Sequence, residues 1–140
     1  MSIQAVLLPV FVQVGLTFIL LLLMGRARFT ALRAREVKLG DIALGQNAWP
    51  DRPAQFARSY QNQFELPILF YVLVVLAIIT KKDDLLFVVL EWLFVATRLV
   101  HAYIHTGSNA VTRRFTAFVA GMTVLIAAWA IFAFRILTGL

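Results

Sequence analysis

The chain has 140 residues, of which 61% are hydrophobic and 14% are charged, and its formal net charge is +6. A soluble domain carries about 25% charged and about 45–50% apolar residues, and a chain of this length encloses too small a core to hide the apolar excess. The absence of cysteine excludes disulfides, thiolate metal sites and thiolate nucleophiles. The basic residues collect between apolar blocks, a pattern that indicates membrane topology and argues against binding to nucleic acid.

The apolar residues fall into four blocks, each close to the roughly 20 residues that cross a bilayer as a helix. They predict helices at about 5–25, 58–80, 85–105 and 114–137. We therefore predict an all-α fold, an integral membrane four-helix bundle that forms a single domain over residues 1–140. The first block has no Lys or Arg before it and no small-residue cleavage site after it, so we expect a retained helix and not a signal peptide.

A long connection is expected at 26–57. Its first part is basic and could form a short helix at the lipid headgroups, whereas its second part is rich in Gly, Pro, Asp and Asn and predicts turns. Nine basic residues lie on the side of this connection and of the turn before the fourth helix, against three on the other side. The positive-inside rule then places the long connection in the cytoplasm and both termini on the opposite side. The compact loops suit a bacterial inner membrane.

The second helix must carry polar residues into the membrane. The apolar stretch 66–80 is too short to span alone, so the helix has to begin earlier and include Arg58, Asn62 and Glu65. At about 100° per residue these three side chains share one face. Pro67 cannot donate a backbone hydrogen bond to the carbonyl of residue 63, which predicts a kink beside this face.

A second polar stripe is expected on the third helix, where Glu91, Arg98 and His105 share a face and His101 lies beside them. One interpretation is structural, with Glu65 and Arg98 forming an ion pair that joins two helices. The other is a polar cavity, open to the cytoplasm, for an anionic ligand, because arginines outnumber acidic residues there and Arg suits bidentate carboxylate recognition. The two histidines are spaced i, i+4 as in some zinc sites, but no third ligand is evident, so no metal is predicted.

These motifs resemble a known family. Residues 58–67, RSYQNQFELP, and residues 98–105, RLVHAYIH, are similar to the second and third helices of the membrane-associated proteins in eicosanoid and glutathione metabolism (MAPEG). Arg114 opens the last helix, where the family has its catalytic Arg. The order and length of the four helices also agree, so the resemblance covers nearly the whole chain.

The resemblance implies a homotrimer that binds glutathione between neighbouring subunits near the cytoplasmic side. Its implied glutathione-binding residues are Arg28, Arg58, Asn62, Glu65, Arg98, His101 and either Tyr103 or His105. Arg114 would stabilise the thiolate, although the adjacent Arg113 could face the sulfur instead. The family often has Tyr seven residues after the third-helix Arg, a position that His105 occupies in this chain.

The expected function is that of a glutathione-dependent transferase or peroxidase. It would act on lipophilic electrophiles or lipid hydroperoxides, with glutathione as co-substrate, no metal, and a lipophilic co-substrate that arrives from the membrane lipids. The first alternative is a non-catalytic protein of the same fold that binds or presents lipids. The second is a transport protein that uses the polar stripes as a path, which is disfavoured because the outer halves of the first and fourth helices carry no matching polar stripe.

Overall fold

The computed structural model describes residues 1–45 and 47–140, and within them the chain forms six helices and no strand. The helices are α1 (Ile3–Arg33), α2 (Leu39–Ile42), α3 (Asp51–Asn62), α4 (Leu66–Thr80), α5 (Leu85–Thr106) and α6 (Val111–Thr138). Four stretches are long and apolar enough to cross a membrane, and the second of them combines α3 and α4. The prediction of an all-α membrane four-helix bundle is confirmed.

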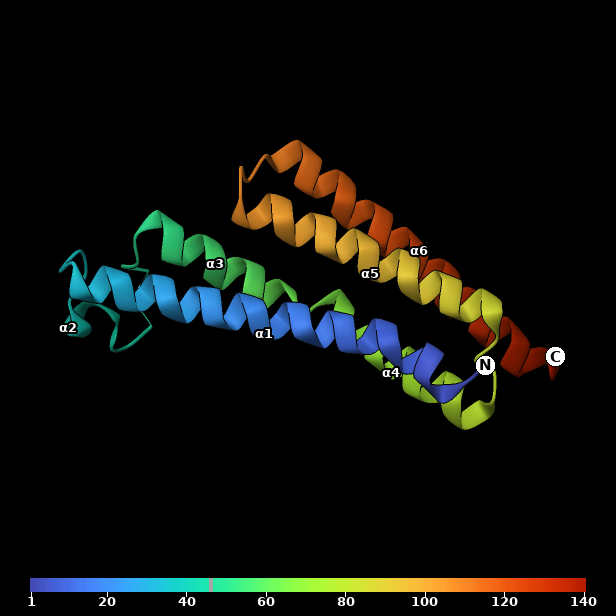
Figure 1. Cartoon of the computed structure of the whole chain (residues 1–140). Helices are drawn as coiled ribbons and strands as arrows, with labels where there is room; N and C mark the ends of the chain where they lie inside the picture. The colour runs from blue at the N-terminus through green and yellow to red at the C-terminus, as the bar shows by residue number, and fades with distance from the viewer. Residues whose placement is uncertain (46) are drawn as a thin grey trace.

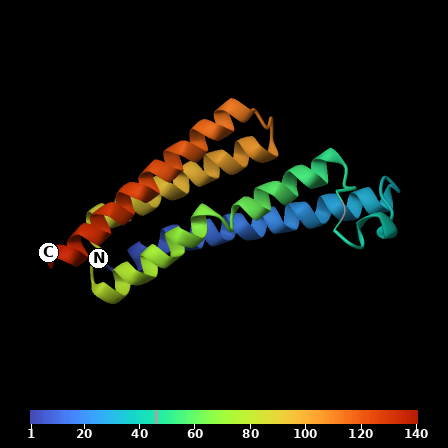
Figure 2. The same cartoon turned by 180° about the vertical axis from the view of Figure 1, so that it is seen from behind.

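The bundle consists of two helix pairs that diverge from one end (Figure 1). The first pair is α1 with α3 and α4, which run side by side, and the second is the α5–α6 hairpin. Both views show the pairs close together near the two chain termini and spread apart toward the end that carries α2 (Figures 1 and 2). At the closed end the amino group of Met1 bonds to the carbonyl of Asp83 at 3.0 Å, and Arg135 pairs with Asp84 at 2.8 Å.

The first helix is longer than the sequence predicted, because α1 continues past Gly25 to Arg33. No Pro follows Gly25 before Arg33, and the residues between them favour helix, so nothing interrupts the hydrogen-bond ladder. A helix of 31 residues is about 46 Å long, against about 30 Å for the hydrocarbon core. The basic last turns of α1 therefore extend beyond the hydrocarbon, where a separate short helix at the headgroups was predicted.

Local chemistry defines several of the other helix ends. The side chain of Ser2 caps α1 by accepting from the backbone N–H of Ala5 at 3.3 Å, and Asp84 caps α5 by accepting from Phe87 at 3.0 Å. Lys81 ends α4 and Gly139 ends α6, both with left-handed backbone conformations (φ 57° and 73°). A short turn at residues 81–84 connects α4 directly to α5.

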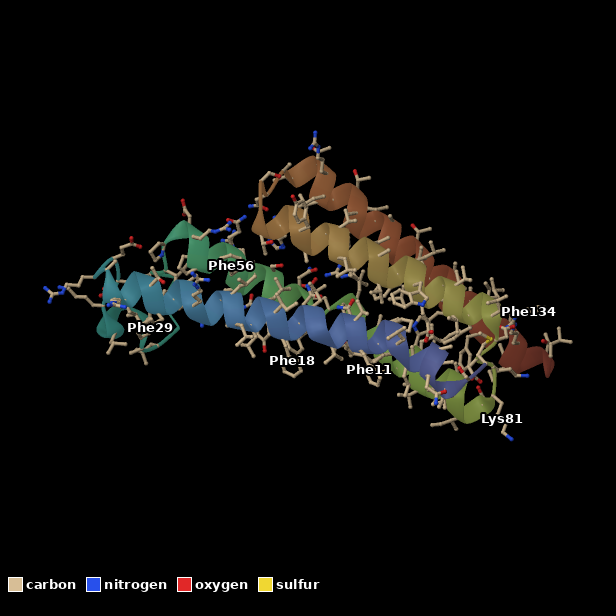
Figure 3. All side chains as sticks on the ribbon, in the orientation of Figure 1. Phe11, Phe18, Phe29, Phe56, Lys81 and Phe134 are labelled. Atoms are coloured by element: carbon tan, nitrogen blue, oxygen red, sulfur yellow. The ribbon has the colours of Figure 1, made fainter. Side chains whose placement is uncertain are left out.

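An apolar core fills the bundle toward its closed end. It includes Val6 of α1, Leu73 of α4, Val95 of α5 and Leu125 of α6. Large apolar side chains also cover the outside, as lipid requires: Phe11 and Phe18 are 62% and 60% exposed and project away from the bundle (Figure 3). The buried polar residues lie inside the bundle, and most of them lie toward the open end.

Candidate functional site

The second membrane span is broken where the sequence predicted a kink within one helix. α3 ends at Asn62 and α4 begins at Leu66, with Pro67 at its N-terminus. Between the two helices, the backbone N–H groups of Gln63 and Phe64 bond back three residues, which forms tight turns. The span does not continue as one helix because Pro67 lacks the N–H that the carbonyl of Gln63 would need. The break places Asn62 at the last residue of α3 and Glu65 just before α4, outside regular helix.

Asn62 links the break to α5. Its side-chain amide nitrogen donates to Oε2 of Glu65 at 2.7 Å, and its side-chain oxygen accepts from Nη2 of Arg98. The direct ion pair between Glu65 and Arg98, which was the structural interpretation of these charges, is not among the ion pairs of the described residues. The charges are instead bridged by a neutral amide, which leaves part of each group available to a ligand.

A buried amide pair supports the break from behind. Gln13 of α1 donates to Oε1 of Gln63 at 2.9 Å, and Gln63 donates to the backbone carbonyl of Ser59 at 3.0 Å. All three residues are buried. This pair was not predicted, although Gln13 is the one amide side chain of the apolar stretch 5–25 and is therefore an anomaly in the sequence that points to a buried polar partner.

The polar stripe on α5 is buried, as its periodicity indicated. Arg98 is 1% exposed, and His101 and His105 also lie inside, with their rings edge to face at 5.5 Å between centroids. Nε and Nη1 of Arg98 and Nδ1 of each histidine have no hydrogen-bond partner within the described residues. Glu91, two turns further into the membrane, is also buried without a partner for its carboxyl oxygens. Buried polar atoms of this kind are rare unless a ligand or water satisfies them.

The stripe opens onto a cavity of about 250 Å³ between the end of α3 and the α5–α6 hairpin. The cavity is lined by Asn62, His101, His105, Val111, Arg114, Phe115 and Phe118. Nη1 of Arg114 donates to Oδ1 of Asn109 at 2.6 Å, and this asparagine stands in the turn before α6 with a left-handed backbone (φ 53°). The cavity thus combines an arginine that is held by Asn109, two histidines, an amide and apolar walls.

The two adjacent arginines of α6 have different surroundings. Arg114 lines the cavity, whereas Arg113 lines a separate apolar groove between α5 and α6. Consecutive helix residues are about 100° apart, so neighbouring side chains leave a helix in different directions. The structure therefore brings Arg114, and not Arg113, together with His101 and His105.

Five more of the predicted site residues do not line the cavity of this chain, although two of them, Glu65 and Arg98, bond to Asn62 in its wall. The guanidinium of Arg28 stacks on the ring of Trp49, with 4.9 Å between its central carbon and the ring centroid. Arg58 is exposed one turn before Asn62, and Tyr103 is 81% exposed. Of the two residues proposed to complete the set on α5, His105 is the one that reaches the cavity.

A clamp between α3 and the end of α5 holds the open end of the site. Gln55 donates to the carbonyl of His105 at 2.6 Å and to that of Gly107 at 3.1 Å, and Arg52 donates to the carbonyl of Thr106. These carbonyls lack partners in the last turn of a helix. The clamp was not predicted, because nothing in the sequence indicates which loop residue meets which helix end.

Comparison with known families agrees with this architecture. The MAPEG family model matches residues 6–134, a range that reaches from the first turns of α1 nearly to the end of α6. The chain belongs to the MAPEG family. Neither the curated proteins nor the solved structures that were compared with the chain gave a match.

Membership places the observed cavity in a known chemical context. The family includes glutathione transferases, peroxidases and eicosanoid synthases, and its members generally use glutathione. Together with the four membrane-spanning stretches, membership identifies the chain as an integral membrane protein. The motifs around Arg58 and Arg98 fall within the matched range, and so does Arg114.

Proposed function

We propose that this chain is a glutathione-dependent transferase or peroxidase that acts on lipophilic electrophiles or lipid hydroperoxides. The observation that carries the proposal is the position of Arg114 in one cavity with Asn62, His101 and His105. A guanidinium beside a thiol stabilises its anionic form, and the thiolate is the nucleophile in conjugation and in peroxide reduction.

The buried polar atoms fit the chemistry of glutathione, which carries two carboxylates, an ammonium group and a thiol. Nε and Nη1 of Arg98 have no partner within the described residues, so each can donate one hydrogen bond to an anionic ligand, and Glu65 can accept from the ammonium. Nδ1 of each histidine is also without a partner within the described residues. The residues present therefore suit an anionic peptide better than they suit a neutral lipid.

We propose assembly into a homotrimer, which the family resemblance implies, and the small size of the cavity supports a site that is shared between subunits. Its volume of about 250 Å³ falls below the roughly 300–1,000 Å³ of most small-molecule sites. We propose that a neighbouring subunit completes the site, and that the surface positions of Arg28, Arg58 and Tyr103 let them reach a ligand at that interface. The lipophilic co-substrate would enter from the bilayer, past the apolar walls formed by Phe115 and Phe118.

In the transferase reaction the thiolate sulfur attacks an electrophilic carbon. A carbon–sulfur bond forms, and the displaced electron pair is protonated. In the peroxidase reaction the sulfur attacks the distal hydroperoxide oxygen and the O–O bond breaks, which leaves an alcohol and a glutathione sulfenic acid. A second glutathione then forms the disulfide and water. Arg114 would stabilise the thiolate at the start of either reaction.

The test is glutathione binding to detergent-purified protein by calorimetry, combined with the ultraviolet absorbance of the thiolate. We expect binding with a thiolate signal. In Arg114→Ala the thiolate signal at neutral pH should disappear and turnover should fall about 100-fold or more, the effect of losing one charge-stabilising group. Arg33→Ala, which removes an exposed arginine at the same end of the bundle, is the matched control.

Each result has a distinct meaning. Full activity in Arg114→Ala would refute the role of Arg114. Binding without a thiolate signal would favour a non-catalytic ligand-holding or lipid-presenting protein. No binding at millimolar glutathione would remove glutathione from the proposal and make lipid presentation the leading function.

A further inference from the structure

The α5–α6 hairpin has a second concave surface, and it is not the one that carries the histidines. This groove has a volume of about 540 Å³ and is therefore larger than the site cavity. Its walls include Leu93, Ala96 and Val100 of α5 and Arg113, Ala117 and Ala120 of α6. The alanines create the hollow, because short side chains stand where neighbouring positions carry Leu, Phe or Val.

The walls of the groove offer almost no polar group to a ligand. The hydroxyl of Thr97 donates to the carbonyl of Phe94 at 2.6 Å, and that of Thr116 donates to the carbonyl of Thr112 at 2.9 Å. Both hydroxyl protons are thus used within their own helices. Several of the lining side chains are exposed, including Leu93 and Val100 at 50% and 52%. The groove is therefore an apolar trough on an exposed side of the hairpin.

One end of the trough carries a positive charge. Arg113 is exposed and forms no hydrogen bond or ion pair within residues 1–45 and 47–140. It stands in the first turn of α6, at the open end of the bundle, where a phosphate could lie level with its guanidinium. Arginine binds phosphate through two parallel hydrogen bonds.

The length of the groove matches one leaflet of a bilayer. From Leu93 to Ile104 the α5 wall spans twelve residues, and the eleven steps between them cover about 16 Å at the helical rise per residue. Half of a hydrocarbon core is about 15 Å thick. A cation at the headgroup level and an apolar trough that reaches the bilayer centre are complementary to one lipid with an anionic head.

We propose that the α5–α6 groove binds an anionic phospholipid of the surrounding leaflet, with one acyl chain in the trough and its phosphate on Arg113. This site is separate from the glutathione cavity, and it does not depend on the proposed enzymatic function. The two arginines of the α6 N-terminus would then serve two ligands on two faces of one hairpin.

The test is native mass spectrometry of delipidated protein titrated with dioleoyl phosphatidylglycerol or dioleoyl phosphatidylcholine. We expect one preferred phosphatidylglycerol per chain. Arg113→Gln should lower phosphatidylglycerol affinity about fivefold, the contribution of one basic residue near an anionic surface, and bring it to the affinity for phosphatidylcholine. Ala120→Leu should fill the trough and weaken both lipids. The matched controls are Arg33→Gln, another exposed arginine, and Ala130→Leu, an exposed alanine of α6 outside the groove.

The proposal is overturned by three results. If Arg113→Gln and Arg33→Gln reduce binding equally, only the overall charge attracts the lipid. If Ala120→Leu and Ala130→Leu behave alike, the trough holds no chain. If Ala120→Leu changes the number of subunits and leaves lipid binding intact, the groove is an interface between copies. Circular dichroism of each variant checks its folding, and the two substitutions test the site independently.

Discussion

At the scale of single residues, the properties of the site depend on amides that carry no charge. Asn62 joins an arginine of α5 to a glutamate at the break between α3 and α4. An amide can do this because it is a donor on one side and an acceptor on the other. A carboxylate could accept from Arg98, but it would repel Glu65.

This dual role gives the first residue-level prediction. Asn62→Asp should weaken glutathione binding about tenfold or more, because it loses the hydrogen bond to Glu65 and adds a like charge beside it. Calorimetry measures the effect. Gln61→Glu is the matched control, since Gln61 is an exposed amide that makes no side-chain hydrogen bond among the described residues. Equal losses in the two variants would show that added negative charge, and not the bridging amide, causes the effect.

A second residue-level prediction concerns the anchor of Arg114. Asn109→Gly removes the side chain that holds the guanidinium but tolerates the left-handed backbone at this position. We expect glutathione to bind with little change in affinity and to ionise less readily. The measurement is the pH midpoint of the ultraviolet thiolate signal, which should move to higher pH as it does, more strongly, in Arg114→Ala. An unchanged midpoint would mean that Arg114 needs no anchor.

At the scale of helices, α5 and α6 approach each other closely at Gly121, which has no side chain. A Cβ added to Gly121 would lie 2.6 Å from Oγ1 of Thr97, which is itself bonded to the carbonyl of Phe94. Small residues permit such close approach between membrane helices. The hairpin that carries both the cavity and the α5–α6 groove is therefore packed through this contact.

We expect Gly121→Ala to destabilise the protein by about 1–3 kcal/mol, the usual cost of overpacking. Thermal unfolding in detergent, followed by circular dichroism, measures it. Gly15→Ala is the matched control, because a Cβ at Gly15 meets no atom within 4 Å and Ala favours helix over Gly. If Thr97→Ala fails to relieve the Gly121→Ala defect, this contact is not its cause.

At the scale of the whole molecule, the divergence of the two helix pairs places the site at one end. The closed end holds both termini and the ion pair between Arg135 and Asp84, whereas the cavity and α2 lie toward the open end (Figure 2). The orientation of the chain in the membrane thus decides which compartment the cavity opens to, and which compartment would supply the proposed glutathione. The distribution of basic loop residues predicts that the open end faces the cytoplasm.

Single cysteines test this orientation, since the chain has none of its own. We expect a membrane-impermeant maleimide to label Leu140→Cys in intact cells, and to label Ala43→Cys only after the cells are opened. Both positions are exposed, so labelling reports the compartment and not burial. The opposite pattern would reverse the orientation and place the site outside the cytoplasm.

The sequence by itself determined the membrane fold and most of the polar face of α5. The length of an apolar block and the spacing of polar residues along a helix are local properties of the sequence. They can therefore be recognised without knowing how the helices pack. The missing backbone N–H of Pro67 also predicted an irregularity in the second helix at this residue. The sequence did not predict a complete break or the true end of α1. Local helix propensity alone does not decide where a helix stops, because tertiary contacts can extend or interrupt it.

The tertiary structure decided which residues meet. The sequence could not choose between Arg113 and Arg114, or between Tyr103 and His105, since each choice depends on where the hairpin lies against the rest of the bundle. It gave no sign that Gln55 would bond to the end of α5. Such contacts join residues about fifty positions apart, and their geometry follows from how whole helices pack, which no local pattern of residues encodes.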